Sequence, residues 1–188
     1  MQKDRLHSFI STGFYIGKIP FAPGTFGSLF AVLVWIVFNY FAFAVSLNIG
    51  GGLFYTFYTI ATIWALIIFA TFFMGIKSSA YYCRKHRKDD AGEVVIDEFC
   101  GQWIALFLSC LASGTFGLAM TKPNLPYLIA IFSSFILFRI FDIWKPWVIG
   151  KIDKNIKGGL GVMLDDVAAG IFAGLVFAIL KTVIGIWR

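Results

Sequence analysis

The chain has 188 residues, of which 59% are hydrophobic and only 14% are charged. A soluble domain of this length usually carries about 25% charged residues, so the composition indicates lipid as the solvent. The formal net charge of +6 does not indicate nucleic acid binding, because so apolar a chain has no solvated face for a duplex. It is better assigned to membrane topology and to anionic headgroups.

The N-terminal segment, residues 1–24, is predicted to be an amphipathic entry segment rather than a cleavable signal peptide. Lys18 follows only a short, interrupted apolar stretch, and no small-residue cleavage pattern is present. After it, the 58 consecutive residues 19–76 contain no Lys, Arg, Asp, Glu or His. Since a transmembrane helix needs about 20 apolar residues, two spans are predicted here, at 26–47 and 53–74, joined by a glycine-rich turn.

The second half of the chain mixes apolar stretches with charge. A basic segment at 77–88 breaks at 89–92, and a third span is predicted to begin after Asp97 and Glu98 and to continue to about residue 120. A fourth span, 127–147, carries Arg139, Asp142 and Lys145 in its last third, where charge is costly. The sequence then predicts a basic, glycine-rich loop at 150–164 and a fifth helix at 165–187, in which Lys181 is expected to snorkel.

Together these segments predict an all-α, multi-spanning membrane protein with about five transmembrane helices plus the N-terminal amphipathic segment. The whole chain, 1–188, is interpreted as a single domain. In a five-span arrangement, 13 of the 16 Lys and Arg residues fall on one side. The positive-inside rule places that side in the cytoplasm.

Six of the ten acidic residues fall at predicted helix ends on the cytoplasmic side, namely Asp97, Glu98, Asp142, Asp153, Asp165 and Asp166. Carboxylates gathered at a membrane boundary repel one another and lose hydration, so their convergence predicts a bound cation. Oxygen ligands favour Mg²⁺. Helix capping is an alternative for each acidic doublet, and Asp142 is spaced to pair with Arg139 or Lys145. Capping does not explain a third, intramembrane acid beside both doublets.

Two turns that contain glycine precede predicted helices and are candidates for binding phosphate through backbone N–H groups. The first, at 23–28, includes Thr25 and Ser28, and the second, at 157–161, includes Lys157, Gly158 and Gly159. Each turn alone is a weak signal, because glycine turns before helices are common.

The residues that other phosphatase mechanisms need are absent from this sequence or poorly placed in it. The three cysteines, Cys83, Cys100 and Cys110, have no metal-ligand spacing and are expected to be small buried hydrophobic residues. None has an arginine six residues downstream, which excludes a Cys-x₅-Arg thiolate mechanism. The only histidines, His7 and His86, are poorly placed for a phosphohistidine mechanism. Metal-assisted attack on a phosphomonoester remains.

Four segments in order resemble the phosphatidylglycerophosphatase A family: PGTFGSL at 23–29, DEFCGQW at 97–103, FRIFDIWKPW at 138–147 and DKNIKGGLGVMLDDVAAG at 153–170. The resemblance covers residues 10 to 175. It implies a Mg²⁺-dependent lipid phosphatase that converts phosphatidylglycerophosphate to phosphatidylglycerol in phospholipid biosynthesis. It also implies a site that faces the cytoplasm from the bacterial inner membrane, with no nucleic acid partner and no evident obligate protein partner. The family's acidic motif positions fall on Asp97, Glu98, Asp142, Asp165 and Asp166, and its basic one on Lys145.

We hypothesise that these five carboxylates hold the metal and activate water. Lys145, with Arg139 or Lys157, would hold the phosphate, and its oxygens would be cradled by Thr25, Ser28, Gly158 and Gly159.

Two rival interpretations were weighed. A CDP-alcohol phosphatidyltransferase would need a long Asp-Gly…Ala-Arg…Gly…Asp…Asp pattern that is absent here. A small membrane transporter would use Asp142 as a pathway residue, but it would not need thirteen basic residues on one face.

Overall fold

The computed structural model describes residues 2–48, 52–88, 91–115 and 125–184, and these are almost entirely helical. In chain order the elements are α1 (Gln2–Ser11), the short 3-10 helix η1 (Ile16–Lys18), α2 (Pro23–Asn48), α3 (Leu53–His86), α4 (Ile96–Ser113), α5 (Leu125–Trp144), α6 (Val148–Asn155) and α7 (Gly158–Ile184). No strand occurs among the described residues, so the all-α prediction is confirmed. Residues 49–51 of the predicted glycine-rich turn and residues 116–120 of the third predicted span lie outside the described residues.

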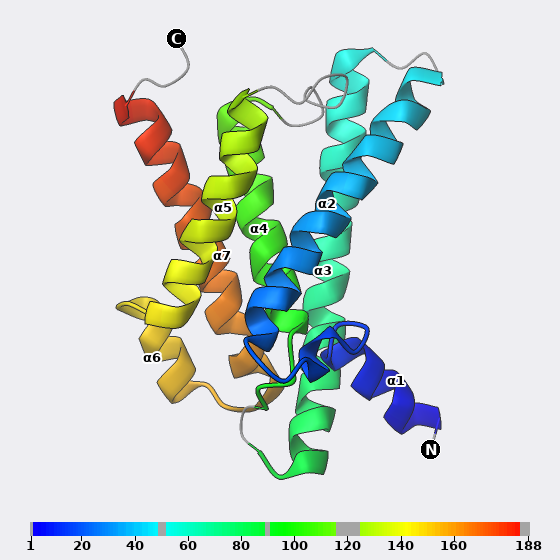
Figure 1. The fold of residues 1–188 in the computed structure, drawn as a ribbon, viewed down its shortest axis with the longest axis vertical. Coiled ribbons are helices and arrows are strands. Elements are labelled where there is room, and N and C mark those ends of the chain that lie inside the picture. Colours follow the sequence, from blue (N-terminus) through cyan, green and yellow to red (C-terminus); the bar gives the residue numbers. More distant parts are fainter. Residues whose placement is uncertain (1, 49–51, 89–90, 116–124, 185–188) are drawn as a thin grey trace.

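Four helices, α2, α3, α5 and α7, are long and apolar enough to cross a membrane. They run along the long axis of the molecule (Figure 1), and they correspond to the first, second, fourth and fifth predicted spans. The chain is therefore a multi-spanning helical membrane protein.

Helix α4, the third predicted span, is the central helix of the bundle. It packs against α2, α3, α5 and α7, and most of its residues are buried. Asp97 and Glu98 occupy its first turn, and the rest of α4 is covered mainly by the surrounding helices. Four of the five predicted spans are thus long and apolar enough to cross a membrane within the described residues, and α4, the remaining one, lies among them.

Tryptophans join the first three long helices at the centre. Trp35 of α2 stacks on Trp64 of α3, with ring centroids 4.3 Å apart. Trp103 of α4 donates from Nε1 to the backbone oxygen of Ala31, at 2.9 Å. A buried indole N–H needs such an acceptor, so this bond fixes the height of α4 against α2.

Helices α4 and α7 approach each other closely enough for their backbones to touch. A Cβ atom added to Gly170 would collide with the backbone of Gly101, and one added to Gly101 would collide with the backbone oxygen of Asp166. The absence of side chains at these two positions lets the backbones touch. The acidic first turn of α4 is thereby held beside Asp166 of α7.

The prediction of a loop at 150–164 is wrong. Residues 148–155 form α6, and α7 begins at Gly158, so Asp165 and Asp166 lie inside a helix rather than at its start. The glycines serve helix packing here, because a Cβ atom on Gly159 would collide with the backbone of Ile76 and Ala80 in α3. Capping is therefore excluded as the role of this acidic doublet.

The N-terminal segment forms α1, which lies against the last turns of α3, and η1, which packs against α2 (Figure 1). The His7 ring stacks on Tyr81 at 4.5 Å, and Nδ1 of His7 is 3.2 Å from the hydroxyl of Ser78. The Tyr81 hydroxyl also donates to the carboxylate of Asp4. These polar contacts attach α1 to the end of α3 that carries the basic segment.

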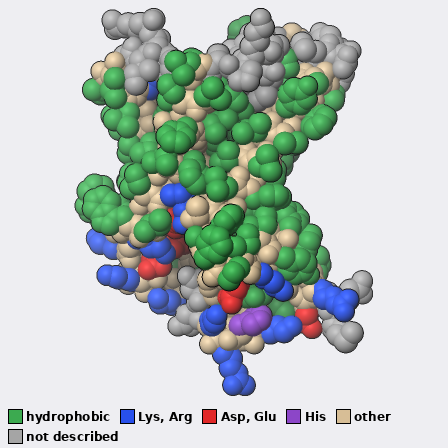
Figure 2. All heavy atoms as spheres, in the orientation of Figure 1, with side chains coloured by type: hydrophobic (Ala, Val, Ile, Leu, Met, Phe, Trp, Pro, Cys, Tyr) green, Lys and Arg blue, Asp and Glu red, His purple; other side chains and the backbone are tan. Residues whose placement is uncertain are grey.

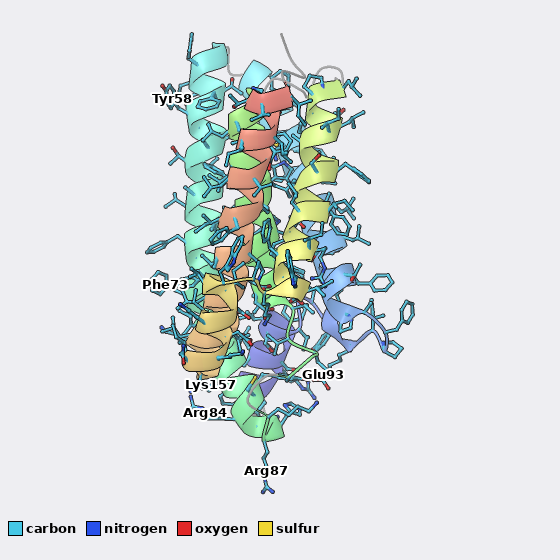
Figure 3. All side chains as sticks on the ribbon, turned by 90° about the vertical axis from the view of Figure 1, so that its left-hand side faces the viewer. Tyr58, Phe73, Arg84, Arg87, Glu93 and Lys157 are labelled. Atoms are coloured by element: carbon cyan, nitrogen blue, oxygen red, sulfur yellow. The ribbon has the colours of Figure 1, made fainter. Side chains whose placement is uncertain are left out.

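Charged side chains gather at one end of the molecule (Figure 2). Arg84, Arg87, Glu93 and Lys157 mark this end, which we call the charged end, and Tyr58 lies near the other (Figure 3). Lys181 is an exception, because its ammonium donates to the backbone oxygen of Ala112 near the opposite end of α4, at 2.6 Å. Lys122 and Arg188 lie outside the described residues.

Candidate active site

A cavity of about 360 Å³ lies at the charged end, where the start of α2, the first turn of α4, the end of α5 and the first half of α7 meet. All five of the predicted carboxylates line it. The complete lining consists of Ala22, Pro23, Gly24, Thr25, Ala91, Gly92, Val94, Asp97, Glu98, Arg139, Asp142, Ile143, Lys145, Val162, Asp165 and Asp166. Acids that are far apart in the sequence therefore face one space.

Three of these acids form a tight group. One carboxylate oxygen from each of Asp97, Glu98 and Asp166 lies within 4.8 Å of the others. Oε2 of Glu98 and Oδ2 of Asp166 are buried and have no hydrogen-bond partner among the described residues. Buried anionic oxygens without donors are unfavourable unless a cation compensates them, and hard oxygen donors suit a divalent ion such as Mg²⁺. The donor set therefore fits a metal ion.

Asp142 and Arg139 form an ion pair on α5. Nη1 of Arg139 lies 2.6 Å from Oδ2 of Asp142, and their side chains are only 16% and 14% exposed. The same nitrogen donates to the hydroxyl of Ser28 on α2 at 3.4 Å, while the Ser28 hydroxyl donates to the backbone oxygen of Gly24. The guanidinium thus joins α5 to α2 and borders the cavity beside the acidic group.

Lys145 carries the second cation of the cavity. It follows the end of α5 with a φ of 46°, and its ammonium lies 2.6 Å from Asp165 and 2.8 Å from Asp153. Burial alone would lower the pKa of Lys145, but the two carboxylates outweigh it and raise the pKa. The ammonium therefore stays charged. It pairs with Asp165 of α7 rather than with Asp142 of α5.

The remaining predicted phosphate-binding residues are divided. Thr25 lines the cavity, and Ser28 reaches it through Arg139. Lys157 and Gly158 instead line a smaller neighbouring hollow with Asp153. Gly159 packs on α3. The structure thus brings the five carboxylates, Arg139, Lys145 and Thr25 together, and it places residues 157–159 beside this group.

Two features of the site were not identified from the sequence. Gly24 approaches Glu98 so closely that a Cβ atom there would collide with the carboxylate. Gln102, one turn beyond Glu98 on α4, is fully buried, and neither polar atom of its amide has a partner among the described residues. An isolated Gln in an apolar stretch, four residues after an acid, was the available signal.

The cysteines take no part in the site. Cys83, Cys100 and Cys110 are all buried and form no disulfide among the described residues, in agreement with the expectation of small buried hydrophobic residues.

Comparisons with known proteins agree with the geometry. The family model described as phosphatidylglycerophosphatase A matches residues 9–181. Two proteins named phosphatidylglycerophosphatase A are similar to the chain: that of Escherichia coli is 31% identical over 90% of this chain and 81% of its own length, and that of Haemophilus influenzae is 33% identical over 90% and 86%. A Bacteroides thetaiotaomicron protein, provisionally named a phosphatidylinositol-3-phosphatase, is 36% identical over 94% of both chains. No solved structure matches the chain.

Proposed function

Because the chain belongs to the phosphatidylglycerophosphatase A family, we propose that it hydrolyses phosphatidylglycerophosphate to phosphatidylglycerol and phosphate in a Mg²⁺-dependent reaction of phospholipid biosynthesis. The observation that carries this proposal is the group formed by Asp97, Glu98 and Asp166, whose oxygens lie within 4.8 Å. It shares one cavity with Arg139 and Lys145. Carboxylates for a cation and cations for a phosphate are the two elements that phosphomonoester hydrolysis needs.

The metal ligands in this proposal are Asp97, Glu98 and Asp166, with Asp142 and Asp165 completing the acidic lining. A bound Mg²⁺ would supply a Lewis acid for the phosphoryl oxygens. A carboxylate of the group accepts a proton from the attacking water. The buried acids thus have two roles in this proposal, which are to bind the metal ion and to accept a proton from water.

The cations bind the phosphate of the substrate. Arg139 and Lys145 donate to its oxygens, and their carboxylate partners Asp142 and Asp165 hold them in place before the substrate arrives. Charge-assisted hydrogen bonds of this kind are stronger than neutral ones. The hydroxyl of Thr25, at the edge of the cavity, adds a neutral donor.

We further propose that the protein lies in the bacterial inner membrane with the charged end toward the cytoplasm. The positive-inside rule supports this orientation, since the basic segment of α3 and the basic residues of α6 are at that end (Figure 3). The phosphate of a cytoplasmic-leaflet lipid then lies at the height of the cavity.

The direct test is phosphate release from phosphatidylglycerophosphate by the purified protein in detergent. We expect release with Mg²⁺, its loss when a chelator removes the ion, and its recovery when excess Mg²⁺ is restored, because the clustered carboxylates repel the phosphate without a cation. A phospholipid without a monoester phosphate serves as the blank. Undiminished release in chelator would refute the metal requirement, and no release under any condition would refute the activity.

A phosphoinositide is the second candidate substrate. The similarity to the provisionally named phosphatidylinositol-3-phosphatase of Bacteroides thetaiotaomicron, over 94% of both chains, favours it. We expect kcat/KM for phosphatidylglycerophosphate to exceed that for phosphatidylinositol 3-phosphate, because the ring-borne phosphate is bulkier at a cavity of about 360 Å³. Parallel phosphate-release assays at equal lipid mole fraction measure the ratio, and the opposite order would assign the phosphoinositide.

A further inference from the structure

We propose that the site cavity opens sideways into the membrane interface between the start of α2 and the end of α5, and that the acyl chains of the lipid substrate lie along those two helices. The inference rests on the proposed function and extends it to how the enzyme selects a lipid over a soluble phosphomonoester.

Packed protein bounds the cavity on two other sides. The backbones of α4 and α7 touch at Gly101 and Gly170, which leaves no passage through that wall. Toward the charged end, the connection before α4 borders the cavity with the buried Ala91 and Val94 and with the exposed Gly92, and does not close it. Between α2 and α5, the hydrogen bond from Arg139 to Ser28 joins the two helices about one turn further from the charged end than Ile143. It closes the gap between them at that position.

The side between Pro23 and Ile143 has a different character. Ile143 lines the cavity and is 73% exposed. Phe21, just before α2, and Trp144 and Trp147, around the end of α5, are 67%, 72% and 75% exposed. We call these four residues the lips. Tryptophan favours the membrane–water interface, so the lips place this opening at the headgroup layer.

Two rows of exposed apolar side chains continue from the lips away from the charged end. Their members, at helical spacing, are Leu29, Leu33 and Ile36 on α2 and Ile140, Ile136 and Phe132 on α5. The first row follows Thr25 and the second follows Ile143, and both of these residues line the cavity. In Figure 2 the apolar surface extends from the charged end over the face that carries α2 and α5.

The two rows and the cavity match the two parts of one phospholipid. The monoester phosphate enters between the lips to reach Arg139 and Lys145, and the acyl chains stay outside along α2 and α5. Each apolar contact that the chains make contributes to binding. A soluble phosphomonoester fills the cavity equally well but gains nothing from the rows.

The test compares polar variants of the lips with a matched control on two substrate forms. Phe21→Gln and Trp144→Gln change one lip each, and neither residue lines the cavity. Met74→Gln makes the same kind of change on α3, at a side chain that is 48% exposed and does not line the cavity. The substrates are long-chain phosphatidylglycerophosphate in mixed micelles and a form whose acyl chains are short enough to keep it water-soluble.

We expect each lip variant to raise KM for the long-chain lipid about tenfold and to leave kcat/KM for the soluble form unchanged, whereas Met74→Gln changes neither. Equal effects of the lip and control variants would overturn the proposal. Equal losses on both substrate forms would overturn it too, because the lips would then act on the site itself.

A second readout does not depend on turnover. A phospholipid monoester with a photoactivatable group in its acyl chain is expected to label peptides from α2 and α5, and excess unlabelled lipid should compete this labelling away. Labelling spread evenly over α3 and α7, or insensitive to competitor, would overturn the proposal. If wild-type protein hydrolyses neither substrate form, the proposed function fails, and the labelling still reports whether the lipid docks at the lips.

Discussion

Replacing Asp166 with Asn is expected to leave the protein folded and to lower Mg²⁺-dependent phosphate release at least about a hundredfold, which corresponds to about 2.7 kcal/mol of transition-state stabilisation. The Asp166 carboxylate is buried, and one of its oxygens has no partner among the described residues. An amide fills the same volume but removes the charge that attracts the cation. Steady-state phosphate release over a Mg²⁺ titration measures the effect.

A matched substitution, Asp4→Asn, removes the same charge on α1, far from the cavity along the chain and outside its lining. This control should retain wild-type release. Wild-type activity of Asp166→Asn at low and at saturating Mg²⁺ would refute the metal role. A shift of the titration midpoint alone, with full activity at saturation, would show that Asp166 contributes to affinity but is dispensable for the reaction.

Replacing Gly170 with Val is expected to destabilise the whole bundle by about 3 kcal/mol, near the upper end for overpacked cores. The new Cβ atom would meet the backbone of Gly101, which cannot rotate away as a side chain can. The helices α4 and α7 would have to separate. Thermal unfolding of the detergent-solubilised protein, followed by circular dichroism, should show a lower Tm, and phosphate release should fall because Asp166 moves from Asp97 and Glu98.

Gly52→Val is the control for this experiment. Gly52 precedes α3, its φ is −63°, and a Cβ atom there meets nothing within 4 Å. This variant should unfold at the wild-type temperature. If Gly170→Val did the same, the α4–α7 contact would not be what holds the acids together.

Hydropathy was sufficient to predict the spans, because long uncharged stretches leave few alternatives in lipid. It was not sufficient for residues 150–164, where glycine was interpreted as a sign of a turn. Gly159 is needed for contact with α3, and a single sequence does not distinguish a glycine that bends the chain from one that admits a neighbouring helix. The error moved the start of the last helix and made capping an alternative role for Asp165 and Asp166, which their place inside α7 excludes.

Which residues form the site was easier to predict than which of them form ion pairs with one another. Acids are so unfavourable in an apolar chain that their positions alone suggested convergence. The partner of Lys145 could not be predicted, because the left-handed residue at the end of α5 turns the chain and directs the ammonium toward Asp153 and Asp165. The three-residue spacing between Asp142 and Lys145 would instead predict an ion pair between these two side chains.

Helix α3 has 34 residues and is about 51 Å long at 1.5 Å per residue, whereas the hydrocarbon core of a bilayer is about 30 Å thick. Its last turns therefore stand in the aqueous layer, where they support α1 through Tyr81 and the first turn of α7 through Gly159. The contact of Gly159 with these turns fixes the position of α7 along α3. The position of Asp166 along the bundle is thus tied to the charged end of a different helix.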